Sequence, residues 1–330
     1  MSKKKQRIKF NSINYIIVNP IIALSSCWLS HRHSDGYEML KEIASLGFEY
    51  AELSHGISAS LVPGIAKAVQ ENVIKISSLH NFCPLPNGLT RPAPDLYEPS
   101  SKKQTQTDAW FRNTLVTIDF ANKLNAHAVV MHLGSMSFFL FDPTKKITQY
   151  VKPTSVESLQ TDPTFQNILN NTFFKLKKKS IPFIQRIQSN INRIIPHAQK
   201  QGVKLCFENR EDIHELPLDC QFLSLLNPFS NSQATGYWHD TGHAQVKEEM
   251  GIITQEQLLS QNKKHLIGFH LQNVIDGKPH RPLRQGSVDF DIIKKFFEPH
   301  HIFCLELSPR CTTEEVLDSK DYLLELTTVD

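Results

Sequence analysis

Short apolar runs alternate with amphipathic helical segments along most of this 330-residue chain, and this alternation constrains the fold more than any other feature. The runs have the length and composition of buried strands, and the segments between them repeat apolar residues at helical spacing. The predicted strands are residues 21–28, 48–53, 74–80, 127–132, 203–207, 235–239, 265–271 and 302–307. The predicted helices are residues 36–46, 61–70, 108–124, 165–201, 217–226, 254–260, 289–297 and 313–326. Eight such pairs predict an α/β fold, a single closed (β/α)8 barrel.

The domain organisation follows from this rhythm. Hydrophobic residues make up 40% of the chain, which is enough for one large core, and no linker divides it. We predict an N-terminal extension at residues 1–20 and one barrel domain at 21–330. The rhythm breaks only at 136–163, where phenylalanines, lysines and prolines mix. A loop this long inside a compact domain is usually functional or flexible, so we expect a lid-like loop insertion after the fourth strand.

The N-terminus permits two interpretations. Residues 3–9 are basic, residues 13–24 are fairly apolar, and Leu24-Ser25-Ser26-Cys27 looks like a lipoprotein cleavage box, which would indicate export. Asn19-Pro20 interrupts the apolar run, however, and cleavage before Cys27 would delete most of the first strand. We therefore expect a cytoplasmic protein.

The rest of the composition agrees with that expectation. The six cysteines have no C-x-x-C spacing and are typical of buried, reduced thiols. No run approaches the roughly 20 apolar residues of a membrane helix, so no membrane partner is expected. The net charge is only +3 and is spread along the chain, which makes a nucleic-acid partner unlikely. A homo-oligomer is possible.

Residues whose side chains can bind a metal ion recur where the predicted strands end. An isolated Asp-x-x-His, such as Asp240 with His243, is more often the capped start of a helix than a metal site. Here six strand ends carry such a residue: His80, His132, Glu208, Asp240, His270 and Glu306. Because the carboxyl ends of barrel strands meet at one mouth, these side chains should converge. Capping of neighbouring helices explains one or two of them, but not the set.

The chemistry of this set indicates the kind of ion. Imidazole and carboxylate ligands without thiolate suit Zn, Mn, Fe, Co or Mg, and the share of histidine favours a transition metal over calcium. We therefore expect a divalent metal ion as the cofactor, of undetermined identity.

The same positions carry a resemblance to a known family. The sequence is similar to the xylose-isomerase-like TIM-barrel superfamily over roughly residues 21–326. That superfamily includes sugar-phosphate isomerases and epimerases and the type-IV apurinic-site endonucleases. The strings that carry the resemblance are S-L-H-N at His80, V-M-H-L-G-S at His132, F-E-N at Glu208, H-D-T-G-H at Asp240 and His243, G-F-H-L-Q-N at His270, H-R-P-L-R-Q-G-S-V-D-F from His280, and C-L-E-L-S-P at Glu306.

The epimerase branch of the resemblance implies a role for each position. Glu208, Asp240, His270 and Glu306 would hold one divalent ion, and Glu208 and Glu306 would also act as the catalytic acid and base on opposite faces of the substrate. The implied substrate-binding residues are His80, His132, His243, His280 and Arg281, although Arg281 could equally form a surface salt bridge. The expected activity is a metal-dependent isomerisation or epimerisation of a small sugar, sugar phosphate or polyol ketone, by proton transfer next to a carbonyl.

Two alternatives stay open. The endonuclease branch uses three zinc ions, and its ligands would map to eight of the residues above and to an aspartate two residues before the final histidine. This chain has Lys278 at that position, and a protonated ammonium cannot bind zinc, which puts the third metal site in doubt. A barrel that binds a metabolite without turnover is the second alternative.

Overall fold

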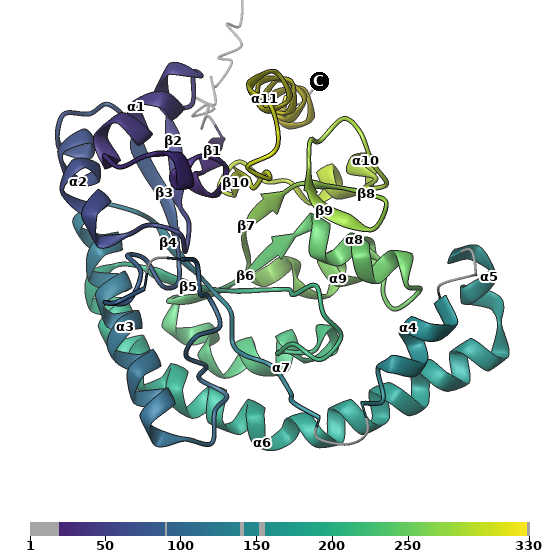
Figure 1. Ribbon diagram of the computed structural model, residues 1–330. Coiled ribbons are helices and arrows are strands. Elements are labelled where there is room, and N and C mark those ends of the chain that lie inside the picture. The colour runs from purple at the N-terminus through teal and green to yellow at the C-terminus, as the bar shows by residue number, and fades with distance from the viewer. Residues whose placement is uncertain (1–19, 90, 139–141, 152–155, 329–330) are drawn as a thin grey trace, which may run out of the picture.

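Eight parallel strands close into one barrel in the computed structural model, which describes residues 20–89, 91–138, 142–151 and 156–328 (Figure 1). The predicted (β/α)8 architecture is confirmed, whereas the predicted extension at 1–20 lies almost entirely outside the described residues. Going round the barrel, the strands follow chain order and β10 closes it against β1. Their bounds are β1 Ile21–Ser25, β2 Tyr50–Leu53, β3 Lys75–His80, β4 Ala128–Met131, β5 Lys204–Glu208, β6 Thr235–Asp240, β7 Leu266–Leu271 and β10 Ile302–Leu305.

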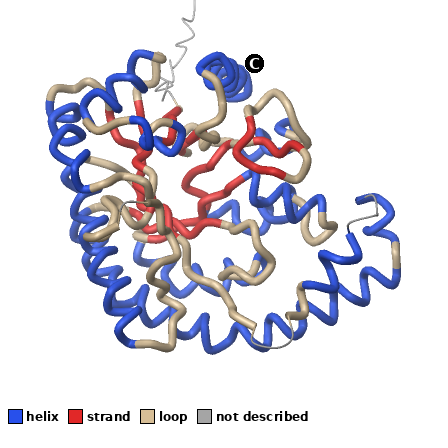
Figure 2. Tube along the Cα trace, in the orientation of Figure 1, coloured by secondary structure: helices blue, strands red, loops and turns tan. Residues whose placement is uncertain are grey.

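Helices surround the barrel on its outer face (Figure 2). They are α1 Gly36–Ser45, α2 Val62–Gln70, α3 Gln104–Lys123, α6 Pro163–Gln201, α7 Phe222–Leu226, α8 Thr241–Glu249, α9 Gln255–Asn262, α10 Phe290–Ile293 and α11 Thr313–Thr327. Side chains fix where several of them begin: Asp35 caps α1, and Thr254 and Thr312 form capping boxes at α9 and α11. No helix in the described ranges is long and apolar enough to cross a membrane.

The barrel interior is filled by side chains, as its closed shape requires. Trp238 on β6 is fully buried and lies in register with Gly268 on β7. A Cβ atom at Gly268 would stand 2.6 Å from the indole ring, so only glycine leaves room for this tryptophan. The interior below the strand ends is therefore a packed core and not a channel.

The long helix α6 contains two prolines, Pro182 and Pro196, which predict a bend or a division of the helix. It is not divided, since it runs as one 39-residue helix. Ile187, Ile191 and Ile194 on one face are completely buried, and α6 packs against α3 and β5. This packing holds the helix together where each proline removes a hydrogen bond.

The insertion at 136–163 is not the loop that we predicted, because its described part contains the helices α4 Lys145–Val151 and α5 Val156–Thr161. Both pack against α6, and Ile147 and Leu159 are fully buried. The local sequence is a poor helix signal, and the apolar partner of α4 is the N-terminal part of α6, where the ring of Phe165 lies 5.7 Å from that of Tyr150 between centroids. Its role as a lid stays a prediction.

Three further elements were not among the predicted strands and helices. Helix α8 starts directly at the end of β6, and an antiparallel hairpin of β8 Asn273–Ile275 and β9 Lys278–Arg281 follows β7. The hairpin turns at Asp276 and Gly277, both with positive φ (52° and 66°). All six cysteines are free thiols, but the expected burial holds for only four of them, because Cys27 is partly buried and Cys220 is exposed.

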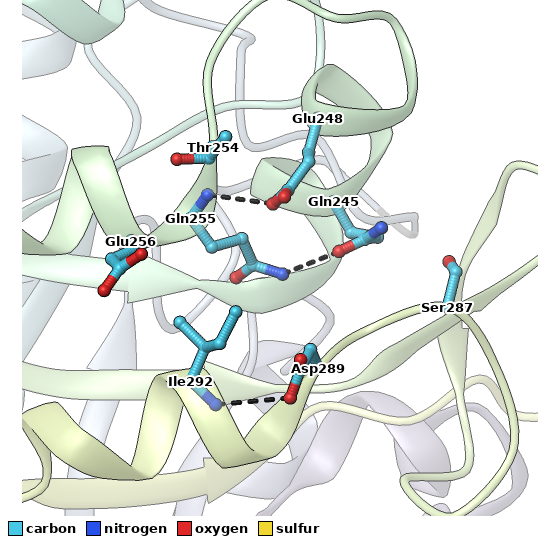
Figure 3. Close-up of a pocket in the computed structure, with 8 residues that line it drawn as sticks. All are labelled: Gln245, Glu248, Thr254, Gln255, Glu256, Ser287, Asp289 and Ile292. Carbon is cyan, nitrogen blue, oxygen red and sulfur yellow. Dashed lines mark hydrogen bonds between the residues drawn. The ribbon is translucent and has the colours of Figure 1, made fainter. Parts of the chain in front are cut away.

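A pocket between α8, α9 and the start of α10 belongs to this outer layer (Figure 3). Gln255 ties the helices together, because its backbone N–H donates to Glu248 Oε2 (2.9 Å) and its amide donates to Gln245 Oε1 (2.9 Å). The pocket contains none of the strand-end residues singled out above, and its polar groups serve the packing of the helical shell.

Candidate metal centre

Four of the predicted residues meet at the mouth of the barrel. Glu208 and Asp240 are the last residues of β5 and β6, His270 is near the end of β7, and Glu306 directly follows β10. Each offers one ligand atom, and these four atoms lie within 4.8 Å of one another. All four side chains are buried. Strands far apart in sequence thus bring three carboxylates and one imidazole to one point.

Asp240 caps a helix and also faces the candidate metal site, so both interpretations of Asp-x-x-His apply to it. Its Oδ1 accepts a hydrogen bond from the backbone N–H of His243 (2.7 Å) and so caps α8. Its Oδ2 lies 3.8 Å from His270 Nδ1 and accepts a hydrogen bond from Gln272 Nε2 (2.6 Å). One oxygen therefore starts the helix while the other faces the cluster.

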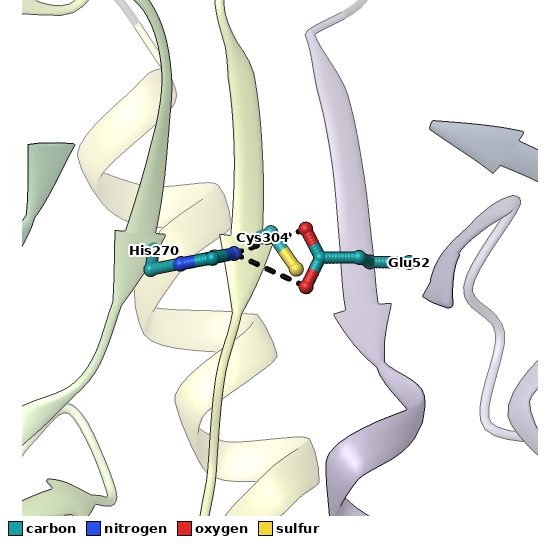
Figure 4. A group of neighbouring side chains, drawn as sticks. All are labelled: Glu52, His270 and Cys304. Carbon is teal, nitrogen blue, oxygen red and sulfur yellow. Dashed lines mark hydrogen bonds and ion pairs between the residues drawn. The ribbon is translucent and has the colours of Figure 1, made fainter. Parts of the chain in front are cut away.

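His270 is oriented by Glu52, a residue that sequence reasoning missed. The Nδ1 atom of His270 lies 2.5 Å from Glu208 Oε1, and its Nε2 lies 2.9 Å from Glu52 Oε2 (Figure 4). Ser25 and Ser78, on the two strands that flank β2, donate hydrogen bonds to the Glu52 carboxylate at 3.1 and 2.8 Å. A carboxylate on Nε2 keeps a proton there and leaves Nδ1 with a lone pair for an ion.

Cys304 lies beside this pair on β10, in register with His270. Burial and the neighbouring carboxylates of Glu52 and Glu306 raise the pKa of its thiol well above the ordinary value. Its sulfur lies within 4.8 Å of a ligand atom of His270 and one of Glu52, so these three residues form a further group of potential ligands beside the first.

We expect Glu52→Gln to weaken binding of a divalent ion about 10- to 100-fold, because a neutral amide no longer raises the basicity of His270 or holds its tautomer. Calorimetric titration of metal-free protein with Zn²⁺ measures the effect. Glu49→Gln is the matched control, since Glu49 precedes the same strand and is exposed. Equal affinities for native protein and Glu52→Gln would contradict the positioning role.

The electrostatics of the cluster fit a dication. Burial, together with the charges of Glu208 and Glu306, raises the pKa of Asp240 well above its ordinary value. Burial and the charges of Glu208 and Glu52 likewise raise the pKa of Glu306 to about 7, although His270 opposes this. In contrast, His270, His132 and Arg210 hold the pKa of Glu208 well below its usual range despite burial. Raised pKa values mean that these crowded carboxyl groups take up protons when no cation lies between them, and a dication would stabilise their charged forms. Their oxygen and nitrogen donors suit Zn, Mn, Co, Fe or Mg.

Three histidines line one side of this cluster. The ring of His80 lies 4.9 Å from that of His55 and 4.7 Å from that of His132, measured between centroids. The Nδ1 atoms of His55 and His80 are buried, and no described residue forms a hydrogen bond with them. His55 was not predicted, because it lies two residues beyond its strand in a loop. These two histidine nitrogens therefore have unused hydrogen-bonding capacity.

Arg210 is a second residue that the sequence did not reveal. Its Nη1 donates to Glu208 Oε2 (2.8 Å) and lies 2.6 Å from His132 Nε2. On the other side of that imidazole, His132 Nδ1 lies 3.0 Å from Asp95 Oδ1 in the loop that follows β3. The only sequence signal for Arg210 was its position in the string F-E-N-R, two residues after the predicted ligand Glu208.

The remaining predicted residues lie on the opposite side of the mouth. His243 Nδ1 lies 3.6 Å from Asp240 Oδ2, and His280 Nδ1 lies 4.0 Å from Glu306 Oε2. Arg281 is half-buried on β9, with no hydrogen bond or ion pair to the four donors among the described residues, and its Nε is a buried donor without a partner there. Lys278, at the start of the same strand, is exposed.

Comparisons with known proteins support the fold. Residues 40–323 match the model of a family described as xylose isomerase-like TIM barrel. No curated protein matches the chain by sequence. Three similar solved structures are 3-keto-D-glucoside 4-epimerase from E. coli (TM-score 0.62, 10% identity, 93% of this chain and 100% of that chain), D-psicose 3-epimerase from Clostridium cellulolyticum (0.63, 11%, 93% and 99%), and a protein from Thermus thermophilus soaked with ZnCl2 (0.57, 18%, 93% and 98%). Likeness at such low identity shows a shared fold.

Proposed function

The chain belongs to the xylose isomerase-like TIM barrel family, and from this premise we propose that it is a metal-dependent isomerase or epimerase. Its substrate would be a small sugar, a sugar phosphate or a polyol ketone. The similar structures named as sugar epimerases support the reaction class.

The observation that carries the proposal is the position of two carboxylates around one candidate ion site. Glu208 and Glu306 extend from β5 and β10, which two other strands separate in the barrel. His270 Nδ1 lies between them, 2.5 Å from Glu208 Oε1 and 3.5 Å from Glu306 Oε2. Two carboxylates on either side of a small substrate can remove a proton from one face and return one to the other.

In this proposal Glu208, Asp240, His270 and Glu306 hold the ion. When bound, a divalent ion polarises a carbonyl or hydroxyl oxygen and thereby acidifies the neighbouring C–H. Glu208 takes the proton from that carbon, and Glu306 delivers a proton to the other face. The nitrogens of His55, His80 and Arg281 that have no partner among the described residues would bind substrate oxygens, together with His243 and His280. His132 was also predicted to bind substrate, but both of its ring nitrogens already have partners in Asp95 and Arg210. Burial of the mouth keeps bulk water away from the carbon that loses its proton.

Deuterium exchange tests the proposal directly. The purified protein is incubated in D₂O with a panel of ketoses, sugar phosphates and inosose-type polyols, with and without a chelator. We expect deuterium next to the carbonyl of at least one compound, loss of exchange on chelation, and recovery when Mn²⁺, Co²⁺ or Zn²⁺ is added back.

The alternatives make different predictions in the same experiment. Cleavage of an abasic-site oligonucleotide without deuterium exchange would favour the endonuclease activity and overturn ours. Binding of metal and sugar with no exchange across the panel would favour a barrel that binds a metabolite without turnover. A cytoplasmic location and a homo-oligomeric state stay predictions.

A further inference from the structure

A second group of potential ligands lies next to the first at the barrel mouth. His80, His132 and Glu208 are all buried, and each offers an atom within 4.8 Å of the other two. Two imidazoles and a carboxylate form a common ligand set for zinc. On ligand chemistry alone, the mouth could therefore take two ions that share Glu208.

Arg210 occupies this second position. Its Nη1 lies 2.8 Å from Glu208 Oε2 and 2.6 Å from His132 Nε2, the two atoms through which these residues approach each other to 3.1 Å. A guanidinium has donors and no acceptor, so both atoms must offer it a lone pair. Those are the same lone pairs that a metal ion would need.

A second carboxylate, that of Glu215, fixes the position of the Arg210 guanidinium. Arg210 Nε donates to Glu215 Oε1 (3.0 Å), and the other oxygen of Glu215 accepts from the backbone N–H of Asp212 (2.8 Å). The side chains of Arg210 and Glu215 are only 12% and 13% exposed. The arginine is therefore built into the site and does not move freely at its surface.

Glu208 divides its two oxygens between these neighbours. Its Oε1 faces His270 Nδ1 (2.5 Å), in the group formed with Asp240 and Glu306. Its Oε2 faces Arg210 and His132 at 2.8 and 3.1 Å. On the first side Glu208 thus meets another residue of the same ligand group, while the second position contains a permanent positive charge, which also repels any further cation.

We propose that Arg210 is a built-in cation that takes the place of a second metal ion, so that the barrel mouth binds one divalent ion per chain. This inference rests on the proposed function for the first ion, and it names the residue that sets the metal stoichiometry. A single ion beside a fixed guanidinium suits proton transfer next to a carbonyl. A mechanism that needs several metal ions would lack its second ion here.

Metal stoichiometry tests the proposal without any assay of activity. Metal-free native protein, Arg210→Ala and Arg210→Gln are each titrated with Zn²⁺ by calorimetry, and bound zinc is counted by elemental analysis after gel filtration. We expect one ion per chain for the native protein and two for both variants. The double variant Arg210→Ala/His132→Ala should return to one ion, because it lacks a ligand of the second position.

Circular dichroism checks that each variant is folded, and Arg210→Gln decides the matter if the alanine variant does not fold. Two tightly bound ions in the native protein, or one ion in both folded variants, would overturn the proposal. If the native protein binds no ion, the proposed centre fails, but Arg210→Ala should still gain one ion that depends on His132. Absence of that gain would overturn the role of Arg210 separately.

Discussion

Glu306→Gln should lower kcat about 10²- to 10⁴-fold, which is the usual contribution of a general acid or base. Glu306 is only 4% exposed, lies across the mouth from Glu208, and would deliver the proton to the second face of the substrate. Glutamine keeps the shape and one oxygen ligand but cannot exchange a proton. We therefore expect turnover to fall far more than substrate affinity.

The measurement needs metal occupancy beside kcat and KM, because Glu306 is also a proposed ligand. Elemental analysis of each preparation separates lost proton transfer from lost metal. Glu298→Gln is the control, since Glu298 precedes the same strand at the other end of the barrel and is 63% exposed. An unchanged kcat in fully metallated Glu306→Gln would remove Glu306 from the mechanism.

Asp240→Ala should lose the bound divalent ion and, with it, all metal-dependent exchange. Asp240 is completely buried, and its carboxylate is one of the four donors within 4.8 Å of one another. The alanine variant also lacks the helix cap of α8, which typically costs about 1 kcal/mol of stability. We expect metal content at background level and a modestly lower Tm.

Asp240→Asn separates these two effects. Its amide oxygen can still accept the hydrogen bond from His243 N–H, so Tm should stay close to that of the native protein, while the lost charge weakens metal binding. Full metal occupancy in folded Asp240→Ala would show that the ion, if any, is held elsewhere.

The barrel and the strand-end residues could be predicted because both depend on local sequence. A buried strand and an amphipathic helix each have a characteristic spacing of apolar residues, and the carboxyl ends of barrel strands must share one mouth. That topological rule was sufficient to predict that Glu208, Asp240, His270 and Glu306 lie together. The family resemblance added roles for them, and those roles stay proposals.

Helices α4 and α8 show where local sequence is insufficient. Residues 145–151 have a weak helical pattern, and they fold as a helix against the N-terminal part of α6. Helix α8 has its cap in Asp240, the residue that also faces the ion site. For α4 a tertiary contact decides the structure and leaves no clear local signal. For α8 the local signal was the Asp-x-x-His cap, which the sequence could not separate from a metal ligand because Asp240 is placed to serve as both.

The sequence by itself determined the order of strands and helices, and hence which side chains stand at the barrel mouth. Only the tertiary structure decided which of them touch. Glu52 and His270 are separated by 218 positions in the chain, and they meet because barrel closure sets β2 across from β7. Arg210 and His55 lie in loops whose path depends on packing, so the spacing of residues in the sequence could not predict their positions at the mouth. The physical reason is that periodicity records which side of an element is buried, whereas contacts at the mouth depend on how the whole barrel closes.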